Sequence, residues 1–228
     1  MGVSNEHGYD DSARINAVRI ALRRWYESHA RDFPWRHNRT PYRTAIAELM
    51  LRRTRAEQVT PVYEAFIAAY PTLDAAAHED SATIIERFRP LGLEWRARDA
   101  AAFIREAHAQ YGRNLPADAE AVRRLPGAGD YVSSAIACFS DGKNQPLIDT
   151  NTVRVLGRVF GVRTDGEARR RKAMRSLAAA AVDPDDPARY HYALIDLAAR
   201  ICRPRNPRCS ECPIASEAAC RFASDNGV

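Results

Sequence analysis

Apolar side chains recur at every third or fourth position near the beginning of this sequence. That spacing places them on one face of a helix and the polar side chains on the opposite face. A first helix is expected over residues 12–30, with its apolar positions at Ile15, Val18, Leu22, Trp25 and Tyr26. It ends before Pro34 and Pro41, which interrupt regular structure.

The same periodicity predicts further helices along the first half of the chain. They are expected at residues 42–54, 61–70, 72–78, 81–89 and 94–112. Pro61 suits the first position of its helix, where the amide that proline lacks would have no intrahelical partner. Apolar runs rich in β-branched residues, which are typical of buried strands, do not occur beyond short fragments. We therefore predict an all-α fold.

Composition and net charge exclude only a few classes of protein. The 228 residues are enough for one large domain or two small ones, and the net charge of +5 suits a polyanionic partner without identifying it. The sequence has no apolar run of the ~18 residues that a membrane helix needs, and its N-terminus is polar. We therefore expect a cytoplasmic protein with no membrane partner.

Four of the five cysteines are concentrated at the C-terminal end, with six, two and seven residues between them. In a reducing compartment such a cluster indicates a metal site rather than disulfides. The spacing differs from the paired hooks of most zinc ribbons and favours an iron-sulfur cluster, with a single zinc ion and a metal-free tail as alternatives. The candidate ligands are Cys202, Cys209, Cys212 and Cys220.

Residues 125–136 (LPGAGDYVSSAI) form a loop with two glycines, Gly127 and Gly129, that opens directly into a helix. Exposed backbone amides at such a helix start can bind one phosphate group of a nucleic acid, whatever its base sequence. An ordinary corner between two helices is the alternative for a loop of this kind. The residues that follow it favour the phosphate site.

The stretch from residue 125 to residue 161 resembles the signature of the endonuclease III and MutY superfamily of helix-hairpin-helix DNA glycosylases. In that signature, L-P-G-x-G is followed about twenty residues later by an aspartate, here Asp149. Residues 33–59 and the cysteine tail look like the same superfamily. The resemblance implies a two-domain all-α fold, a [4Fe-4S] cluster, double-stranded DNA with a mispaired or deaminated base as partner, and a monomer.

By this resemblance, residues 40–143 form a six-helix domain that contains the hairpin. Residues 1–39 and 144–228 form the iron-sulfur domain, and Glu48 and Tyr131 face Asp149 across a cleft between the two. In the cysteine tail, the seven residues before Cys220 exceed the five that are usual in the superfamily. The tail also carries a proline-stiffened set of candidate phosphate contacts: Arg203, Arg205 and Arg208.

Asp149 has two compatible interpretations. Local sequence predicts that it caps the helix that follows, as aspartate often does. The resemblance implies that it is also the catalytic carboxylate, which stabilises positive charge on the sugar as the base departs or activates the attacking water. Asn151 matches a companion of this aspartate in the superfamily.

Tyr131 occupies the position where lyase members carry a lysine that forms a Schiff base with the sugar. A tyrosine cannot form that imine, so the resemblance implies a monofunctional enzyme. The tyrosine also resembles the thymine mismatch branch, which acts on G:T and G:U pairs, whereas adenine glycosylases usually carry serine. It can instead be an aromatic side chain that covers the core.

Glu48 matches the acid that protonates adenine in MutY-type enzymes, although a glutamate on a helix is usually solvated. Arg53 matches a residue that fills the gap left by the extruded nucleotide, and Arg52 is either a phosphate contact or a surface charge. Residues 91–99, with Trp95, resemble a second DNA-facing turn. Two alternatives to thymine and uracil excision remain: an adenine glycosylase and a DNA-binding module without catalysis.

Overall fold

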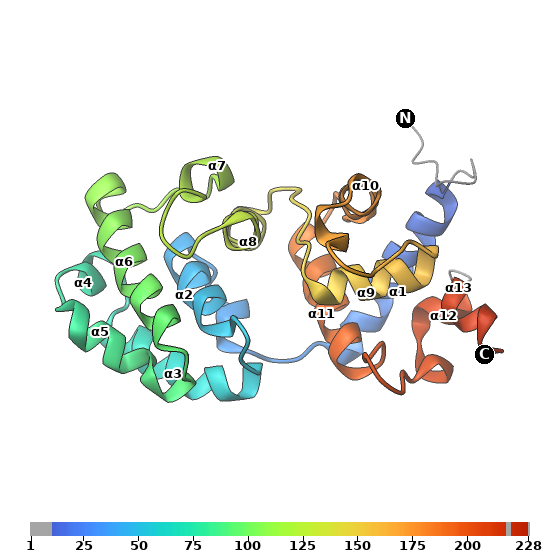
Figure 1. The fold of residues 1–228 in the computed structure, drawn as a ribbon, viewed down its shortest axis with the longest axis horizontal. Helices are drawn as coiled ribbons and strands as arrows, with labels where there is room; N and C mark the ends of the chain where they lie inside the picture. The colour runs from blue at the N-terminus through green and yellow to red at the C-terminus, as the bar shows by residue number, and fades with distance from the viewer. Residues whose placement is uncertain (1–10, 218–219, 228) are drawn as a thin grey trace. The chain divides into compact units, whose positions relative to one another are not determined.

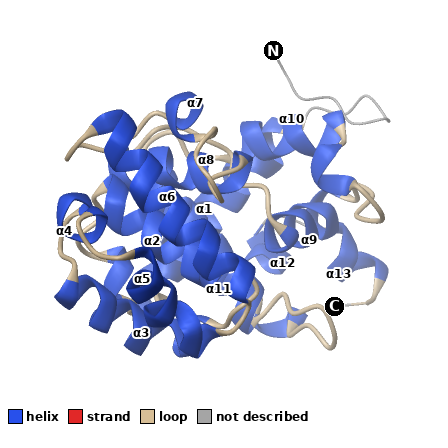
Figure 2. Ribbon diagram, turned by 60° about the vertical axis from the view of Figure 1, so that its left-hand side comes forward, coloured by secondary structure: helices blue, strands red, loops and turns tan. Residues whose placement is uncertain are grey.

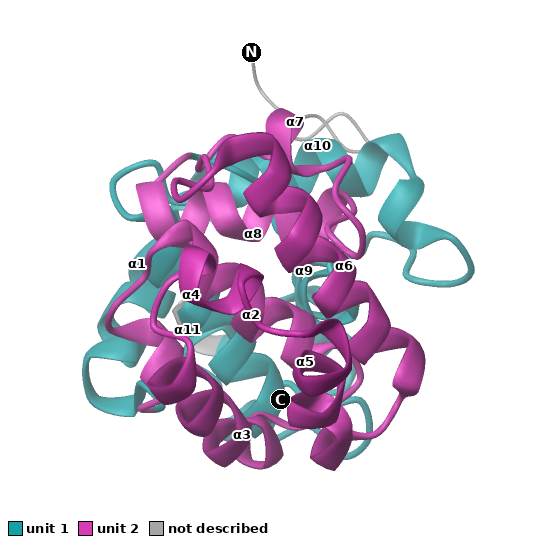
Figure 3. Cartoon of the chain, turned by 90° about the vertical axis from the view of Figure 1, so that its left-hand side faces the viewer, with its two compact units in different colours: residues 1–31, 144–228 teal, residues 32–143 magenta. Residues whose placement is uncertain are grey.

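The computed structural model describes residues 11–217 and 220–227, and within these ranges it contains helices and loops but no strand (Figures 1 and 2). The predicted all-α fold is confirmed. No helix in the described part of the chain has the length and apolar character needed to cross a bilayer. The chain divides into two compact units, one formed by residues 1–31 and 144–228 and the other by residues 32–143 (Figure 3).

The unit of residues 32–143 surrounds one apolar core with short helices. Its elements are η1 (Pro34–Arg36), α2 (Pro41–Leu51), α3 (Ala56–Ala69), α4 (Leu73–Ala77), α5 (Ser81–Phe88), η2 (Arg89–Leu91), α6 (Glu94–Tyr111), α7 (Ala119–Val122) and α8 (Asp130–Asp141). Thr40 caps α2, whose first residue is Pro41. Pro41 therefore begins a helix here, because the first turn does not need the amide hydrogen that proline lacks.

Two boundaries in this unit differ from the sequence-based expectation. Helix α3 begins at Ala56, five positions before Pro61, which lies inside it. The additional turn at the start of α3 is stabilised by burial of Val59 and by a hydrogen bond of 3.0 Å from the Thr60 hydroxyl to the Ala56 carbonyl. Residues 32–39 pack with this unit rather than with the N-terminal helix. Their two aromatic rings, Phe33 and Trp35, are stacked 4.8 Å apart within the same apolar core.

The other unit joins the N-terminal helix to the C-terminal part of the chain. Its elements are α1 (Ser12–His29), α9 (Thr150–Phe160), η3 (Ala168–Arg170), α10 (Lys172–Ala181), α11 (Pro187–Arg200), η4 (Cys209–Glu211), α12 (Pro213–Glu217) and α13 (Arg221–Asp225). Helix α1 packs against α10, α11 and α12. Its buried residues include four of the five apolar positions predicted for the first helix: Ile15, Val18, Leu22 and Trp25.

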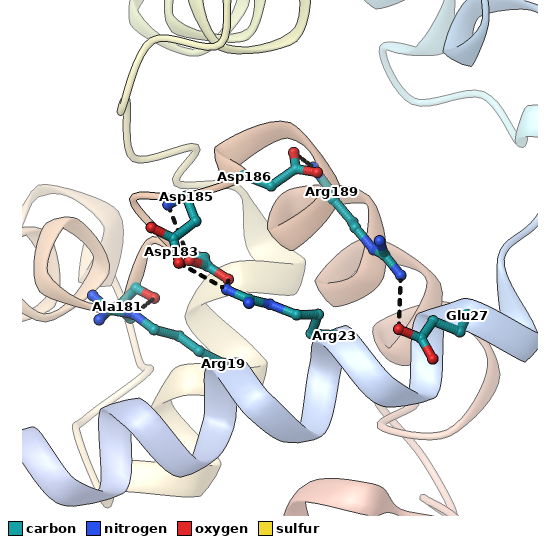
Figure 4. A network of polar contacts seen from close by, with 8 residues as sticks. All are labelled: Arg19, Arg23, Glu27, Ala181, Asp183, Asp185, Asp186 and Arg189. Atoms are coloured by element: carbon teal, nitrogen blue, oxygen red, sulfur yellow. Dashed lines mark hydrogen bonds and ion pairs between the residues drawn. The ribbon is translucent and has the colours of Figure 1, made fainter.

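Polar contacts join α1 to the end of α10 and to the segment between α10 and α11 (Figure 4). Arg19 donates to the Ala181 carbonyl at 3.3 Å. Arg23 forms ion pairs with Asp183 at 2.6 Å and with Asp185 at 3.2 Å. These contacts add to the apolar core that α1 shares with residues 144–228 of the same unit.

Candidate active site and cysteine cluster

The hairpin lies between α7 and α8, and its first glycine is required by geometry. Gly127 has a φ of +72°, and a Cβ atom there would lie 2.9 Å from Cδ2 of Leu49 and 3.2 Å from Cβ of Asp99. Any other residue would be strained and would collide with its neighbours. Gly129 stands directly before α8 and, as a glycine, provides no side-chain cap for that helix. Backbone amides in the first turn of a helix have no intrahelical acceptor, so the start of α8 offers amides that can bind an anion.

The loop after α2 lies beside the hairpin. Arg52 donates to Asp99 at 3.0 Å, and its guanidinium group stacks 4.5 Å from the centre of the Trp95 ring. Arg52 is thus engaged within its own unit rather than being an isolated surface charge. Arg53 is exposed and has a φ of +57°, a left-handed conformation that is uncommon for a residue with a side chain. The backbone here turns sharply at the residue that the sequence predicts to contact DNA.

A buried arginine that sequence reasoning missed fixes this loop and the predicted turn at residues 91–99. Arg96 has no exposed surface, and its two terminal nitrogens lie within hydrogen-bond distance of five acceptors, three of which share the two hydrogens of Nη1. The acceptors are the carbonyls of Met50, Arg52, Leu91 and Gly92 and the hydroxyl of Thr54. One side chain therefore ties together two loops that are about 40 residues apart in the sequence.

Glu48 and Tyr131 lie on α2 and α8, two helices of the same unit that pack against each other. Glu48 is only 8% exposed, so it does not belong to a solvated helix face. Tyr131 is half-buried and packs against the apolar core of the unit. Asp149 belongs to the other unit, where it is partly exposed and not enclosed in the core.

Asp149 caps α9 with both oxygens of its carboxylate engaged. Oδ1 accepts the backbone amide of Thr152 at 2.7 Å, and Oδ2 accepts Nδ2 of Asn151 at 2.8 Å. Capping fixes the position of the carboxylate, and the asparagine fixes its rotation. A carboxylate oxygen has more than one lone pair, so both oxygens can still accept a water molecule or face a positive charge.

The contacts continue from Asn151 to the cysteine loop through Arg154. Nη2 of Arg154 donates to Oδ1 of Asn151 at 2.9 Å, and Nε donates to the carbonyl of Cys202 at 2.8 Å. Nη2 also donates to the carbonyl of Ala198 at 3.1 Å. The predicted catalytic carboxylate and the first predicted metal ligand are thus connected through two side chains.

The four C-terminal cysteines line one hollow in this unit, with an empty volume of about 350 Å³ that includes its solvent-open part. The apolar lining of the hollow includes Val159, Leu197 and Ile214. Arg158 also lines this hollow and donates to Sγ of Cys202 at 3.4 Å and to the carbonyl of Arg203 at 2.8 Å. Burial, together with a smaller contribution from the neighbouring Cys202 and Cys220, raises the pKa of the Cys212 thiol to about 11. The long spacing before Cys220 therefore does not remove this thiol from the group.

The three arginines between the first two cysteines differ in their surroundings. Arg203 is half-buried and donates to the carbonyl of Asn206 at 3.0 Å. Arg208 is exposed and lies 3.5 Å from the carboxylate of Glu211. Arg205 is exposed, and no ion pair with another described residue involves it. Arg205 is therefore the most accessible of the three predicted phosphate contacts.

Comparison with known proteins agrees with this arrangement. Residues 202–217 match the family description "Iron-sulfur binding domain of endonuclease III". A thymine-DNA glycosylase of Aeropyrum pernix is 38% identical over 90% of this chain and 94% of its own length. A thymine/uracil-DNA glycosylase of Pyrobaculum aerophilum is 34% identical over 87% and 88% of the two chains. The human adenine DNA glycosylase is 31% identical over 96% of this chain and 42% of its own length.

Solved structures give the same result. A thermostable thymine-DNA glycosylase superposes with a TM-score of 0.83 at 30% identity, covering 93% of this chain and 97% of that protein. Endonuclease III in a trapped covalent intermediate with DNA has the same fold, with a TM-score of 0.79 at 17% identity and coverage of 95% and 99%. The fold and the cysteine site define a DNA glycosylase with an iron-sulfur domain. The chain belongs to the helix-hairpin-helix DNA glycosylases of the endonuclease III and MutY superfamily.

Proposed function

We propose that this enzyme hydrolyses the N-glycosidic bond of thymine or uracil mispaired with guanine in double-stranded DNA. The observation that carries the proposal is the carboxylate of Asp149, which Thr152 and Asn151 hold at the start of α9. Relatives that are 38% and 34% identical are named thymine-DNA and thymine/uracil-DNA glycosylases, which favours pyrimidine substrates. We also propose that one copy of the chain is the active form.

The reaction we propose begins as the bond between base and sugar lengthens and positive charge develops at C1′. The carboxylate of Asp149 stabilises this charge and orients the water that completes the substitution. Tyr131 has no amine with which to attack the sugar, so the product is an intact abasic site. Thymine and uracil leave as anions more readily than adenine, which reduces the need for an acid. For Glu48 we therefore propose a hydrogen bond to the base or to water.

For the cofactor we propose a [4Fe-4S] cluster bound by Cys202, Cys209, Cys212 and Cys220. The hollow that the four cysteines share, and the match of residues 202–217 to the iron-sulfur binding domain of endonuclease III, support a cubane rather than a single ion. Hydrolysis of an N-glycosidic bond transfers no electrons, so the cluster when bound supplies a rigid support for the loop. We further propose that DNA phosphates bind at Gly127 and Gly129 and at Arg203, Arg205 and Arg208, and that Arg53 fills the gap beside the extruded base.

An adenine glycosylase is the second candidate, because the buried Glu48 occupies the position of the adenine-protonating acid. One assay separates the two. The cluster-loaded protein is incubated with duplexes containing G:T, G:U or adenine opposite 8-oxoguanine, and abasic sites are then cleaved with alkali. Product from G:T or G:U supports the proposal, whereas product from the adenine duplex alone supports the second candidate. DNA binding without any product indicates a module without catalysis.

Two variants test the catalytic residue. Asp149→Asn keeps a side chain that can cap α9 but removes the negative charge, so excision should fall by about a thousandfold or more at unchanged DNA affinity. Asp186→Asn is the matched control, because Asp186 caps α11 of the same unit by accepting the Arg189 amide. It should keep wild-type excision. Near-normal turnover by Asp149→Asn rejects the assignment.

A further inference from the structure

Three metal-binding side chains converge at the surface of the unit formed by residues 32–143, outside every site described above. Asp74 lies on α4, His78 directly follows α4, and His108 lies in the last turn of α6. One ligand atom from each of the three residues lies within 4.8 Å of the other two. The side chains of Asp74 and His108 are about 30% exposed, so the group is open to solvent without being fully solvated.

The hydrogen bond of His78 prepares its ring for a metal ion. Nδ1 of His78 lies 2.7 Å from the backbone carbonyl of Asp74. A carbonyl oxygen only accepts hydrogen bonds, so Nδ1 carries the proton, and the neutral ring has its free lone pair on Nε2. Histidines that bind metals commonly donate their other ring N–H to a carbonyl in this way, which fixes the orientation of the ring.

The pair formed by His108 and Asp74 supplies two more donors at a suitable separation. Nε2 of His108 lies 3.0 Å from Oδ1 of Asp74. Nitrogen and oxygen ligands of a tetrahedral zinc ion, each about 2.0 Å from the metal, lie about 3.3 Å apart. Nε2 of His108 and Oδ1 of Asp74 therefore need to move apart only slightly for a metal ion to replace the proton that they share. The His78 and His108 rings lie 5.5 Å apart at an angle of 70°, so neither blocks the other.

The charged groups around this site allow a cation to bind there. The carboxylate of Asp74 accepts a hydrogen bond from Nε2 of His108 and forms an ion pair with Arg113. Nε of Arg113 lies 3.3 Å from Oδ1 of Asp74, but its side chain is 79% exposed. An exposed ion pair of this kind contributes little, about 0–1 kcal/mol, so the arginine can move away from an incoming metal ion.

We propose that Asp74, His78 and His108 bind a divalent transition-metal ion, with zinc as the preferred ion and water in its remaining coordination position. Two imidazoles and one carboxylate suit zinc and related ions, whereas magnesium and calcium prefer oxygen ligands alone. The ion would join the end of the five-residue helix α4 to the last turn of α6. This site is independent of base excision and of the cysteine cluster.

Equilibrium dialysis of the cluster-loaded, tag-free chain against Zn²⁺ tests the proposal, with zinc and iron measured in the same sample. Wild-type protein should bind one zinc ion per chain at unchanged iron content. His108→Ala and Asp74→Asn should each weaken zinc binding by about tenfold or more, and Asp74→Asn does so with almost no change of shape. His37→Ala is the matched control, because His37 is paired with Asp32 in a histidine–carboxylate contact that has no second imidazole.

Thermal unfolding supplies a second readout that does not depend on activity. Zn²⁺ should raise the unfolding temperature of wild-type protein and of His37→Ala by a few degrees, and Mg²⁺ should not, because only a ligand of the folded state stabilises it. His108→Ala should show no zinc-dependent shift. The proposal is overturned if wild-type protein binds no zinc at constant iron, or if His108→Ala and Asp74→Asn bind it as tightly as wild type.

Discussion

Asn151 donates a hydrogen bond of 2.8 Å to Oδ2 of Asp149 and, through its own Oδ1, accepts one of 2.9 Å from Arg154. The amide group therefore has a defined orientation, with its nitrogen towards the carboxylate and its oxygen towards the guanidinium group. Arg154 in turn donates to the carbonyl of Cys202. The orientation of the Asp149 carboxylate, for which we propose the catalytic role, thus depends on the cysteine loop as well as on its own helix.

Asp149 caps α9, and two substitutions separate this role from the catalytic role that we propose for it. Asp149→Ala removes the cap of α9 and should lower the free energy of unfolding by about 1 kcal/mol, whereas Asp149→Asn should leave it nearly unchanged. Both should abolish excision, because both remove the charge. Chemical denaturation and the alkali-cleavage assay measure the two effects. Equal stability of the two variants would contradict the capping role.

Arg154 is expected to act as a positioning residue. Arg154→Met keeps the apolar stem but removes the hydrogen bonds to Asn151 and Cys202, so the carboxylate of Asp149 loses its fixed rotation. Single-turnover excision should fall by roughly ten- to a hundredfold at constant DNA affinity, since small displacements of a catalytic group are costly. Arg175→Met, at an exposed position of α10, is the control. An unchanged single-turnover rate in Arg154→Met would exclude the positioning role.

Cys220 should be required for the iron-sulfur cluster despite its longer spacing. Cys220 is buried and lines one hollow together with three half-buried cysteines, so Cys220→Ala should lower the iron content and the visible absorbance of the purified protein. Cys138→Ala provides the control, because Cys138 lies on α8 in the other unit and should leave the iron content unchanged. Full iron loading of Cys220→Ala would show that three cysteines are sufficient.

Arg96 should contribute strongly to stability. Arg96→Met leaves four carbonyl groups and one hydroxyl without their buried donor, which should cost about 3 kcal/mol or more of unfolding free energy. Arg98→Met, two residues later, removes only an exposed ion pair with Glu94 and should change stability by about 0.5 kcal/mol or less. Denaturant unfolding compares the two variants. A loss in Arg96→Met no larger than that in Arg98→Met would disprove the bridging role.

His191 should make stability depend on pH. Burial lowers its pKa from 6.5 to about 4, and its ring donates to the carbonyl of Gln145. The unfolded state binds more protons between these two values, so the contribution is fully present above pH 6.5 and is lost as the pH falls towards 4. The difference amounts to about 3 kcal/mol.

His191→Gln keeps a donor but cannot be protonated in this range. Its unfolding midpoint should therefore decline less than that of wild type between pH 6.5 and pH 4. His37→Gln, at an exposed histidine, should retain the wild-type slope. If the two variants decline equally, the buried histidine is not the source of the pH dependence.

Local patterns in the sequence were sufficient for much of the fold and part of the site. The helical period, the hairpin at Gly127 and Gly129, the aspartate that opens a helix and the grouped cysteines each depend on residues that are close together in the chain. Such features depend mainly on backbone geometry and spacing, which neighbouring residues specify directly. They led to an all-α fold, a capped α9 and a shared cysteine site.

Tertiary structure alone decided the features that join distant segments. Arg96 and Arg154 look like ordinary charges on helices in the sequence, and nothing local indicates that one is fully buried and the other connects Asn151 to Cys202. Asp74 and His108 are separated by 34 positions but lie 3.0 Å apart. The physical reason is that the partner of a buried charge is set by how helices pack. That packing depends on the whole core rather than on any one segment.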